Sequence, residues 1–546
     1  MIRFGLKLQH AKRTLGLCAA LALGACGVTP DPAPGVSVQN LDGLPFPDRL
    51  VFSRIGSLST PPGNGVHDTV KMRISNSGSS TLRITGFDVT GPWTVTPAPS
   101  ATQPLEIAAG SSADVTVKFV AQAPGNVTPH LYEGLLKAMS GTSTVATVQL
   151  AGLWQSESEN NQEPSFEDIR RAFGFNFSFV SAGETLSVLT NEHGALRAHG
   201  DEVISPFWRR ADAGQPVRVI QLAAYHQQGQ RASIGWYAKG ASSGLNGIMT
   251  HNGSYGQTVL PHLEGGSGIA AASFTPSADA FGFGIDGVEF SDPNRNGVSG
   301  VCRQTGWLCG HDVRFWSVKD RNGNVIPNTY FMIMDYVGIN YDYNDNIYLV
   351  SNIKPADMLI NVGAPPSSSF VGPGGRVWMS DASNAYAGSD KRNENIIAKP
   401  QAAGTTAPNE PVFGSYPYAG TIAFTDNQEL YKTYRAKMNP DPALPERVMN
   451  YRVPINNGTY TVKLHFAELY WTQPGQRVFD VRIEGATVKS NFDIIQQARA
   501  EHPNTSGKDT AVVLQFPNVQ VTDGVLNIST VTKVDYGALS GIEILR

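Results

Sequence analysis

The stretch NGTYTVKLHFAELYW, residues 457–471, decides the fold class, because apolar and polar side chains alternate along it. Every second residue from Tyr460 to Phe466 is apolar, and Thr, Lys and His stand between them. A period of two is typical of a β-strand with one buried face. We therefore expect a strand that starts after the Asn-Gly turn at 457–458 and carries His465 on its solvated side.

The same alternation recurs along the rest of the chain, in short stretches bounded by Gly, Ser, Asn or Pro. Many short strands joined by turns favour an all-β fold of tandem β-sandwich domains. The clearest helix signal is at 164–173, where Ser165 can cap the helix and Asp168 stands three residues later. The expected strands are 70–75, 81–87, 114–119, 147–153, 217–225, 233–238, 280–285, 312–319, 329–337, 346–353 and 478–483.

Length and composition bound the class of protein. A chain of 546 residues is long enough for about three or four domains. The 42 Lys and Arg residues against 46 Asp and Glu give a net charge of −4, without the basic excess expected of a nucleic-acid-binding protein. We expect a leader at 1–25, a Pro- and Gly-rich tether at 26–45, and β domains at 46–155, 160–356 and 357–546.

The N-terminus has the pattern of an export signal. A basic segment at 3–13 precedes an apolar stretch at 15–23 and the sequence Leu-Gly-Ala-Cys at 23–26. This pattern resembles the lipobox of bacterial lipoproteins, which implies cleavage before Cys26 and a membrane anchor on its thiol. With Gly27 next, the resemblance implies the bacterial cell envelope, and the outer membrane where a cell has two. The alternative is an ordinary secretory peptide in which Cys26 is incidental.

Two further cysteines, Cys302 and Cys309, are separated by the six residues RQTGWL. In an exported protein, the simplest expectation is one disulfide between them. A metal site is the weaker alternative, because two thiols alone do not fill a tetrahedral shell.

Two acidic loops in the region 160–356 suggest a cation. Asp292, Asn294 and Asn296 alternate before a glycine, and Asp342 and Asp345 belong to the sequence YDYND. Alternate oxygens of this kind can surround a calcium ion, although the glutamate of an EF-hand loop is absent. The alternative is that Asp, Asn and Gly only form turns with their own backbone. We expect no required cofactor, and calcium as the optional ligand.

The string at 457–471, followed by GQRVFDV at 475–481, closely resembles the malectin family. The resemblance implies a jelly-roll-like β-sandwich that binds a sugar through aromatic residues on loops at one end, without catalysis. Further segments that match the family in order are 360–363, Trp378 and Asp381 of a W-x-x-D element, 430–435, a strand at 490–494, and 534–544.

The resemblance also implies which residues bind the sugar. Tyr470 and Trp471 match the aromatic pair that stacks on glucosyl rings, and Asp535 matches a carboxylate that accepts sugar hydroxyls. Tyr386 lies near the position of a third family tyrosine, and Tyr434 lies near that of a fourth. The implied partner is an oligosaccharide or polysaccharide, with a glucose-containing glycan as one candidate.

The chemistry of sugars supports these residues independently. A sugar ring has an apolar C–H face and a rim of hydroxyls. Adjacent aromatic rings can stack on the apolar face, and a carboxylate can accept hydrogen bonds from the hydroxyls. The alternative is that Tyr470 and Trp471 only cap the core at a strand end. The chain departs from the family at Ala436, where a family tyrosine is expected.

The two other β regions resemble families that imply little chemistry. Residues 46–155 resemble the immunoglobulin-like domain of abnormal-spindle and hydin proteins, which implies a spacer or interaction module. The YDYND turn before the strand at 346–353 resembles a repeated β-sandwich of bacterial extracellular proteins.

The leading functional hypothesis is a surface-anchored lipoprotein that binds carbohydrate and is not an enzyme. A structural or adhesive surface protein that binds protein partners is the alternative, and an accessory protein of a glycoside hydrolase is a remote one. The sequence has no H-E-x-x-H or Walker-type motif. Glu468 and Asp480 are the carboxylates that a glycosidase mechanism would use here.

Overall fold

The computed structural model describes residues 33–546, apart from 57–65, 124–128, 159–162, 227–230, 242–243, 267, 298–309, 337–340, 366–367, 382–398, 401–411 and 440–446. Strands dominate the described residues, which confirms the all-β prediction. Cys26, Cys302, Cys309 and Tyr386 lie outside them, so the lipid anchor, the disulfide and one sugar contact stay predictions. Within the described part, no helix has the length and apolar character needed to cross a membrane.

The first region of the fold is a pair of four-stranded sheets. Its strands are β1 (Val36–Asn40), β2 (Arg49–Ile55), β3 (Thr69–Asn76), β4 (Leu82–Ile84), β5 (Gly86–Val89), β6 (Trp93–Thr96), β7 (Leu105–Ile107), β8 (Ser112–Phe119), β9 (His130–Ser140) and β10 (Ser143–Gln155). The sheets have the orders β1-β3-β8-β6 and β2-β10-β9-β5. Phe52, Trp93 and Phe119 belong to the apolar core of this region, and the alternation at 114–119 predicted the burial of Phe119.

The second, central region has one sheet of six strands and one of five. Its elements are α1 (Phe166–Phe173), α2 (Ser187–Asn191), β11 (Trp208–Arg210), β12 (Val217–Ala224), β13 (Arg231–Ala238), β14 (Asn246–Asn252), β15 (Ala271–Phe274), β16 (Phe281–Ile285), β17 (Glu289–Phe290), β18 (Val313–Lys319), β19 (Val325–Met334), β20 (Asn346–Ser351) and β21 (Ile353–Pro355). The orders are β14-β13-β16-β11-β21, with β17 on β16, and β15-β12-β20-β19-β18. Ser165 caps α1 as predicted, since its Oγ accepts a hydrogen bond from the Asp168 amide at 3.1 Å.

The third region also pairs a six-stranded with a five-stranded sheet, in the orders β23-β24-β22-β34-β29-β32 and β25-β28-β33-β30-β31. Its elements are β22 (Met358–Asn361), β23 (Ser369–Val371), β24 (Val377–Ser380), β25 (Lys399–Pro400), β26 (Val412–Pro417), β27 (Thr433–Asn439), β28 (Val448–Pro454), β29 (Gly458–Phe466), β30 (Val478–Ile483), β31 (Ala486–Phe492), α4 (Ile494–Glu501), β32 (Val512–Val521), β33 (Val525–Val534) and β34 (Gly541–Leu545). The strand predicted at 490–494 ends at Phe492, because Asp493 caps α4 by accepting a hydrogen bond from the Gln496 amide.

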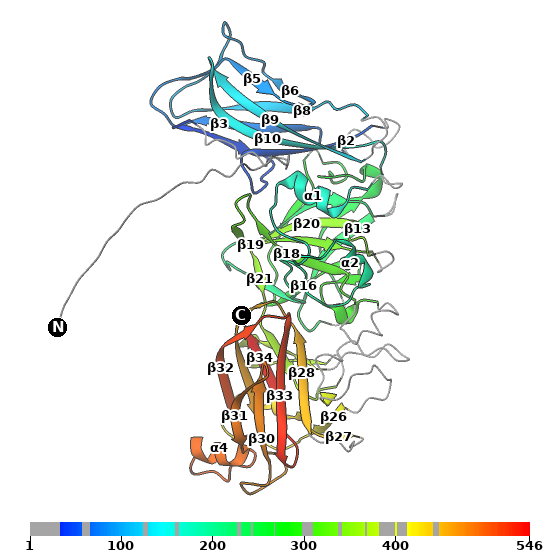
Figure 1. Cartoon of the computed structure of the whole chain (residues 1–546), viewed down its shortest axis with the longest axis vertical. Helices are drawn as coiled ribbons and strands as arrows, with labels where there is room; N and C mark the ends of the chain where they lie inside the picture. Colours follow the sequence, from blue (N-terminus) through cyan, green and yellow to red (C-terminus); the bar gives the residue numbers. More distant parts are fainter. Residues whose placement is uncertain are drawn as a thin grey trace, which may run out of the picture.

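The three regions are stacked along the long axis of the molecule (Figure 1). Arg49 of β2 donates hydrogen bonds to the carbonyls of Arg171 and Ala172, both at 2.8 Å, and so joins the first region to α1. The Asn456 side chain accepts a hydrogen bond from the Ile204 amide at 2.7 Å and joins the third region to the central one. These contacts give the chain a head-to-tail arrangement of its β regions.

Candidate functional site

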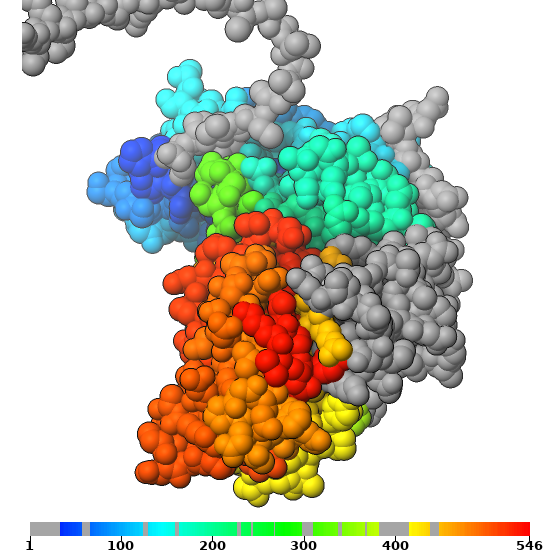
Figure 2. All heavy atoms as spheres, turned by 60° about the horizontal axis from the view of Figure 1, so that its bottom comes forward, coloured from blue at the N-terminus to red at the C-terminus, as the bar shows by residue number. Residues whose placement is uncertain are grey.

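The loop 467–476 carries the predicted aromatic pair and crosses from one sheet of the third region to the other. It follows β29, which starts beside Asn456 and therefore near the central region. Arg499 of α4 donates a hydrogen bond to the Thr472 carbonyl in this loop. The loop thus lies at the end of the molecule marked by α4 at the bottom of Figure 1, which Figure 2 brings forward.

Trp471 and Asp535 meet at this end, as the sequence predicts. Asp535 directly follows β33, whose last residue pairs with the first residue of β30. The Trp471 Nε1–H donates to Asp535 Oδ2 at 2.8 Å, and Arg477 Nη1 lies 3.0 Å from the same oxygen. The Asp535 side chain is 30% exposed, so two donors orient a carboxylate that solvent still reaches. Such a group can accept hydrogen bonds from the hydroxyls of a bound sugar.

Glu468 holds the backbone of the aromatic pair in place. Its Oε1 accepts hydrogen bonds from the backbone amides of Tyr470 and Trp471, both at 3.0 Å. Its Oε2 accepts one from Arg477 Nε at 2.6 Å, and the side chain is only 2% exposed. A buried, charge-assisted network of this kind fixes the loop backbone, and with it the direction of both rings.

Tyr470 presents most of its ring to solvent, with 67% of its surface exposed. It meets Trp471 at right angles, with ring centroids 4.8 Å apart and an interplanar angle of 86°. Ring edges that contact ring faces are a favourable arrangement for aromatic pairs. The ring of Tyr470 is therefore accessible to solvent beside Trp471.

Tyr434 lies near the same charged groups, and it brings Tyr416 with it. Burial raises the pKa of Tyr434, and the charges of Arg477, Glu468 and Asp535 also act on that pKa. Tyr416 pairs with Tyr434 across the β26–β27 hairpin, and the ring centroids are 5.6 Å apart. Hereafter "the aromatic site" means Tyr416, Tyr434, Tyr470, Trp471 and Asp535.

Tyr416 was not predicted, because no periodic pattern in the sequence marks the β26–β27 hairpin that places it. Ala436, at the expected position of a family tyrosine, is 6% exposed and belongs to the core of the third region. The hairpin therefore supplies its aromatic rings from positions 416 and 434 in this chain. The signal that would have found Tyr416 is the pairing of the two hairpin strands, which local sequence does not specify.

A second aromatic surface, also missed from sequence, is formed by Phe424 and His502. Their rings stack with centroids 3.6 Å apart and an interplanar angle of 7°. Phe424 is 58% exposed. Among the large apolar side chains that the structure describes, Phe424 and Tyr470 are the only aromatic ones that are exposed. Ala423 pairs with Thr510, and the nearby Lys508 pairs with Glu468, so the two aromatic surfaces share one end of the sandwich.

Comparison with protein families assigns this region. Residues 357–542 match the malectin domain family. Human malectin is 38% identical over 73 residues, which cover 13% of this chain and 22% of that protein. Malectin-B of Xenopus laevis is 37% identical over 73 residues, covering 13% and 24%. A probable LRR receptor-like serine/threonine-protein kinase of Arabidopsis thaliana is 34% identical over 105 residues, covering 18% and 9%. The chain thus spans 24% or less of the length of these relatives.

Solved structures similar to the chain include the extracellular domain of ANXUR2 from Arabidopsis thaliana, with a TM-score of 0.25 and 13% identity. That match covers 72% of this chain and 91% of the other. A Bacteroides uniformis beta-glucuronidase also has a TM-score of 0.25 and 13% identity, over 64% of this chain and 28% of the enzyme. TM-scores this low carry no conclusion about activity.

His465 of the malectin domain is buried, so its predicted exposure is wrong. The side chain is 10% exposed, its Nε2 lies 2.8 Å from Glu543 Oε1, and its ring packs against Trp378. Although burial favours the neutral acid, the hydrogen bond and charge of His465, together with the charge of Arg376, lower the pKa of Glu543 to about 2. The ionised carboxylate is thus favoured in the folded malectin domain.

This pair predicts an acid limit for the malectin domain. Because the pKa of Glu543 is about 2 when folded and 4.5 ordinarily, its stabilising effect is complete above about pH 4.5 and is lost as the pH falls toward 2. We expect Glu543→Gln to lower the Tm at neutral pH and to flatten the fall of Tm between these pH values. Thermal unfolding at a series of pH values measures this change in Tm, and Glu501→Gln, at an exposed position, is the control. An equal fall of Tm with pH in wild type and Glu543→Gln would contradict the prediction.

The loop at 292–296 has the hydrogen bonds expected if its Asp and Asn side chains only form turns with their own backbone. Asp292 Oδ1 accepts from the backbone amide and the side-chain amide of Asn294, at 3.1 and 2.9 Å. The Asn296 side chain bonds to Phe290 and Gly310 backbone groups and is buried. In the described part of the chain, Asp292 belongs to no group of three carboxylate, imidazole or thiol ligands. The calcium prediction for this loop therefore gains no support.

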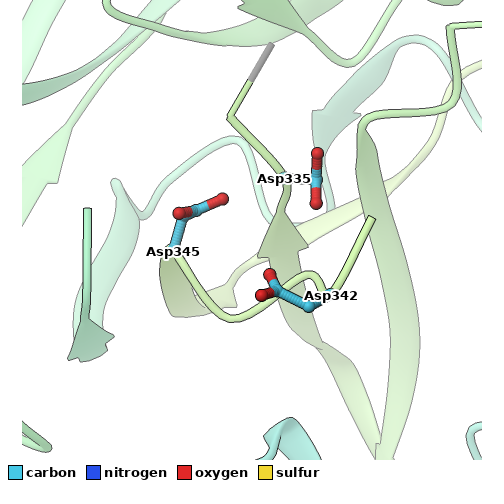
Figure 3. Close-up of side chains that lie close together, drawn as sticks. All are labelled: Asp335, Asp342 and Asp345. Atoms are coloured by element: carbon cyan, nitrogen blue, oxygen red, sulfur yellow. The ribbon is translucent and has the colours of Figure 1, made fainter. Parts of the chain in front are cut away.

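Asp342 and Asp345, the other two predicted cation ligands, do lie close together. A third carboxylate, from Asp335, joins them, and the ligand oxygens of all three lie within 4.8 Å of one another (Figure 3). Asp335 was missed because the strand was predicted to run to residue 337, whereas β19 ends at Met334. The residue therefore stands at a strand end, beside the turn that carries the other two.

Proposed function

We propose that this protein binds an oligosaccharide or polysaccharide at the aromatic site of its malectin domain and does not cleave it. The observation that carries the proposal is the contact between Trp471 and Asp535. It places an apolar ring and an oriented, solvent-accessible carboxylate within one hydrogen bond of each other. A sugar offers the matching surfaces, a C–H face and a hydroxyl rim. The malectin resemblance favours a glucose-containing glycan.

The state of the nearby carboxylates supports binding without hydrolysis. A glycosidase needs two carboxyl groups that flank the scissile bond, one of them able to donate a proton. Glu468 is buried and bound to Arg477 and to two loop amides. Asp480 pairs with Lys533 at 2.8 Å and accepts a hydrogen bond from the Asn491 amide at 2.7 Å. Both side chains are committed to holding the domain together.

The Phe424–His502 surface favours an extended ligand over a single sugar. Its exposed ring lies at the same end of the sandwich as Tyr470. The segment 508–510 lies between them, because Lys508 pairs with Glu468 and Thr510 pairs with Ala423. Neighbouring extended segments lie about 5 Å apart, which separates the two aromatic surfaces by about 10 Å. A linear glycan chain that stacks on both rings would gain affinity from each contact.

The predicted anchor fits the position of this site. We propose that the chain is exported and held in a bacterial envelope through a lipid on Cys26, with the sandwich regions as spacers. The first region and the aromatic site lie at opposite ends of the long axis (Figure 1). An anchor ahead of the first region would therefore hold the site far from the membrane, where a surface glycan can reach it.

A glycan array probed with the full chain tests the proposal. We expect binding to linear glycans, including glucans, with stronger signals for longer chains of the same linkage. Free sugar of the bound type should compete in solution. An array without signal for any glycan would overturn the proposal and favour the adhesive alternative, in which the surface binds protein. Release of shorter sugars from a bound glycan would overturn the non-catalytic part.

A further inference from the structure

Three carboxylates converge in the central region, outside the malectin domain. β19 and β20 pair antiparallel with Met334 opposite Asn346, so Asp335 and Asp345 stand on facing strand ends. Asp342 lies in the connecting turn, and Figure 3 shows the three side chains around one space. Their ligand oxygens all lie within 4.8 Å of one another. Three like charges at this separation repel one another strongly unless something neutralises them.

Asp335 provides a second, independent observation. Its side chain has 0% exposure, and its Oδ1 has no hydrogen-bond partner. Its Oδ2 accepts a long hydrogen bond from the Tyr343 amide, at 3.5 Å. No ion pair in the described part of the chain involves Asp335. A buried carboxylate oxygen without a partner is costly, so this atom points to a ligand that supplies positive charge.

Asp345 is held in place by the hairpin itself. Asp345 Oδ2 accepts a hydrogen bond from the Tyr336 amide at 2.6 Å, which ties the turn to the end of β19. This hydrogen bond keeps Asp345 beside the end of β19, where Asp335 stands.

We propose that Asp335, Asp342 and Asp345 bind one calcium ion. Carboxylate oxygens are the ligands that calcium prefers, and calcium–oxygen distances are about 2.3 to 2.6 Å. Two oxygens on opposite sides of such an ion lie about 4.6 to 5.2 Å apart, so the observed limit of 4.8 Å matches its span. Magnesium at about 2.1 Å spans only about 4.2 Å and requires stricter geometry. The bound ion would fasten the β19–β20 hairpin.

Calcium titrated into the EDTA-treated full chain tests this proposal. Calorimetry should detect one site, and at a calcium concentration one hundred times Kd the Tm should rise by about 5 to 10 °C. Hydrogen exchange should slow in β19 and β20 more than in the malectin domain. Absence of binding, or tighter binding of magnesium than of calcium, would overturn the assignment.

The Asp335→Asn variant separates a cation site from a structural acid. We expect it to weaken calcium binding more than about tenfold, because ligand charge sets affinity. In EDTA, its Tm should equal or exceed that of wild type, because a neutral amide avoids the cost of burying a carboxylate whose Oδ1 has no partner. The exposed Asp279→Asn of the same region is the matched control and should keep wild-type affinity. Unchanged affinity in Asp335→Asn would overturn the proposal. If Asp335→Asn does not fold, Asp345→Asn takes its place with the same expected loss.

Discussion

Tyr470→Ala and Trp471→Ala are each expected to weaken glycan binding by about 30-fold or more, because a central aromatic contact is worth about 2 kcal/mol or more. Tyr470 offers an open ring face, and Trp471 also orients the Asp535 carboxylate through its Nε1–H. Removal of either ring takes away the apolar floor on which a sugar would stack. Calorimetry with the strongest glycan from the array measures the loss, and circular dichroism checks that each variant is folded.

Three further variants divide this effect into its parts. Trp471→Phe keeps a ring but removes the donor to Asp535, so a smaller loss than in Trp471→Ala is expected. Phe424→Ala should weaken binding of long glycans and leave short ones unchanged. Val371→Ala is the control, because Val371 is 71% exposed and the sheet register places it toward the opposite end of the domain. Wild-type affinity in both Tyr470→Ala and Trp471→Ala would remove the aromatic site from the binding surface.

Asp381→Ala is expected to destabilise the malectin domain by about 3 to 5 kcal/mol, the cost of leaving a buried charge without its partner. Asp381 is fully buried and accepts two hydrogen bonds from Arg435, at 2.6 and 2.9 Å. It also accepts one from the Tyr451 hydroxyl at 2.9 Å and one from the Gly363 amide at 3.2 Å. This network joins the segments that follow β22 and β24 to β27 and β28, which is why the W-x-x-D element matters for the fold.

Urea unfolding of the full chain, followed by tryptophan fluorescence, measures the change. Glu429→Ala provides the contrast, since the Glu429–Lys432 pair of the same domain is 50% and 56% exposed and should contribute less than about 1 kcal/mol. The double variant Asp381→Ala with Arg435→Met should recover part of the loss, because it no longer buries an unpaired guanidinium. Equal effects of Asp381→Ala and Glu429→Ala would contradict the interpretation.

The fold was predictable where local pattern and tertiary environment agree. The period-two alternation at 460–466 predicted β29, and the Ser165 cap predicted α1. The prediction that His465 is exposed was wrong. β29 is an inner strand between β34 and β32, and the rings of Trp378 and Tyr431 pack against His465 on its outer face. Alternation assumes one solvated face, and at the His465 end of this strand that face is covered as well.

Sequence alone determined the all-β class, the malectin region and the aromatic pair with its carboxylate, because strand period and an ordered set of motifs are written locally along the chain. The tertiary structure alone decided that Tyr416 joins Tyr434, that Phe424 stacks on His502, and that Asp335 faces Asp345. Each of these contacts depends on the register or packing of segments that are separate in sequence. Register is set by the burial of whole strands, so no short stretch of residues encodes it.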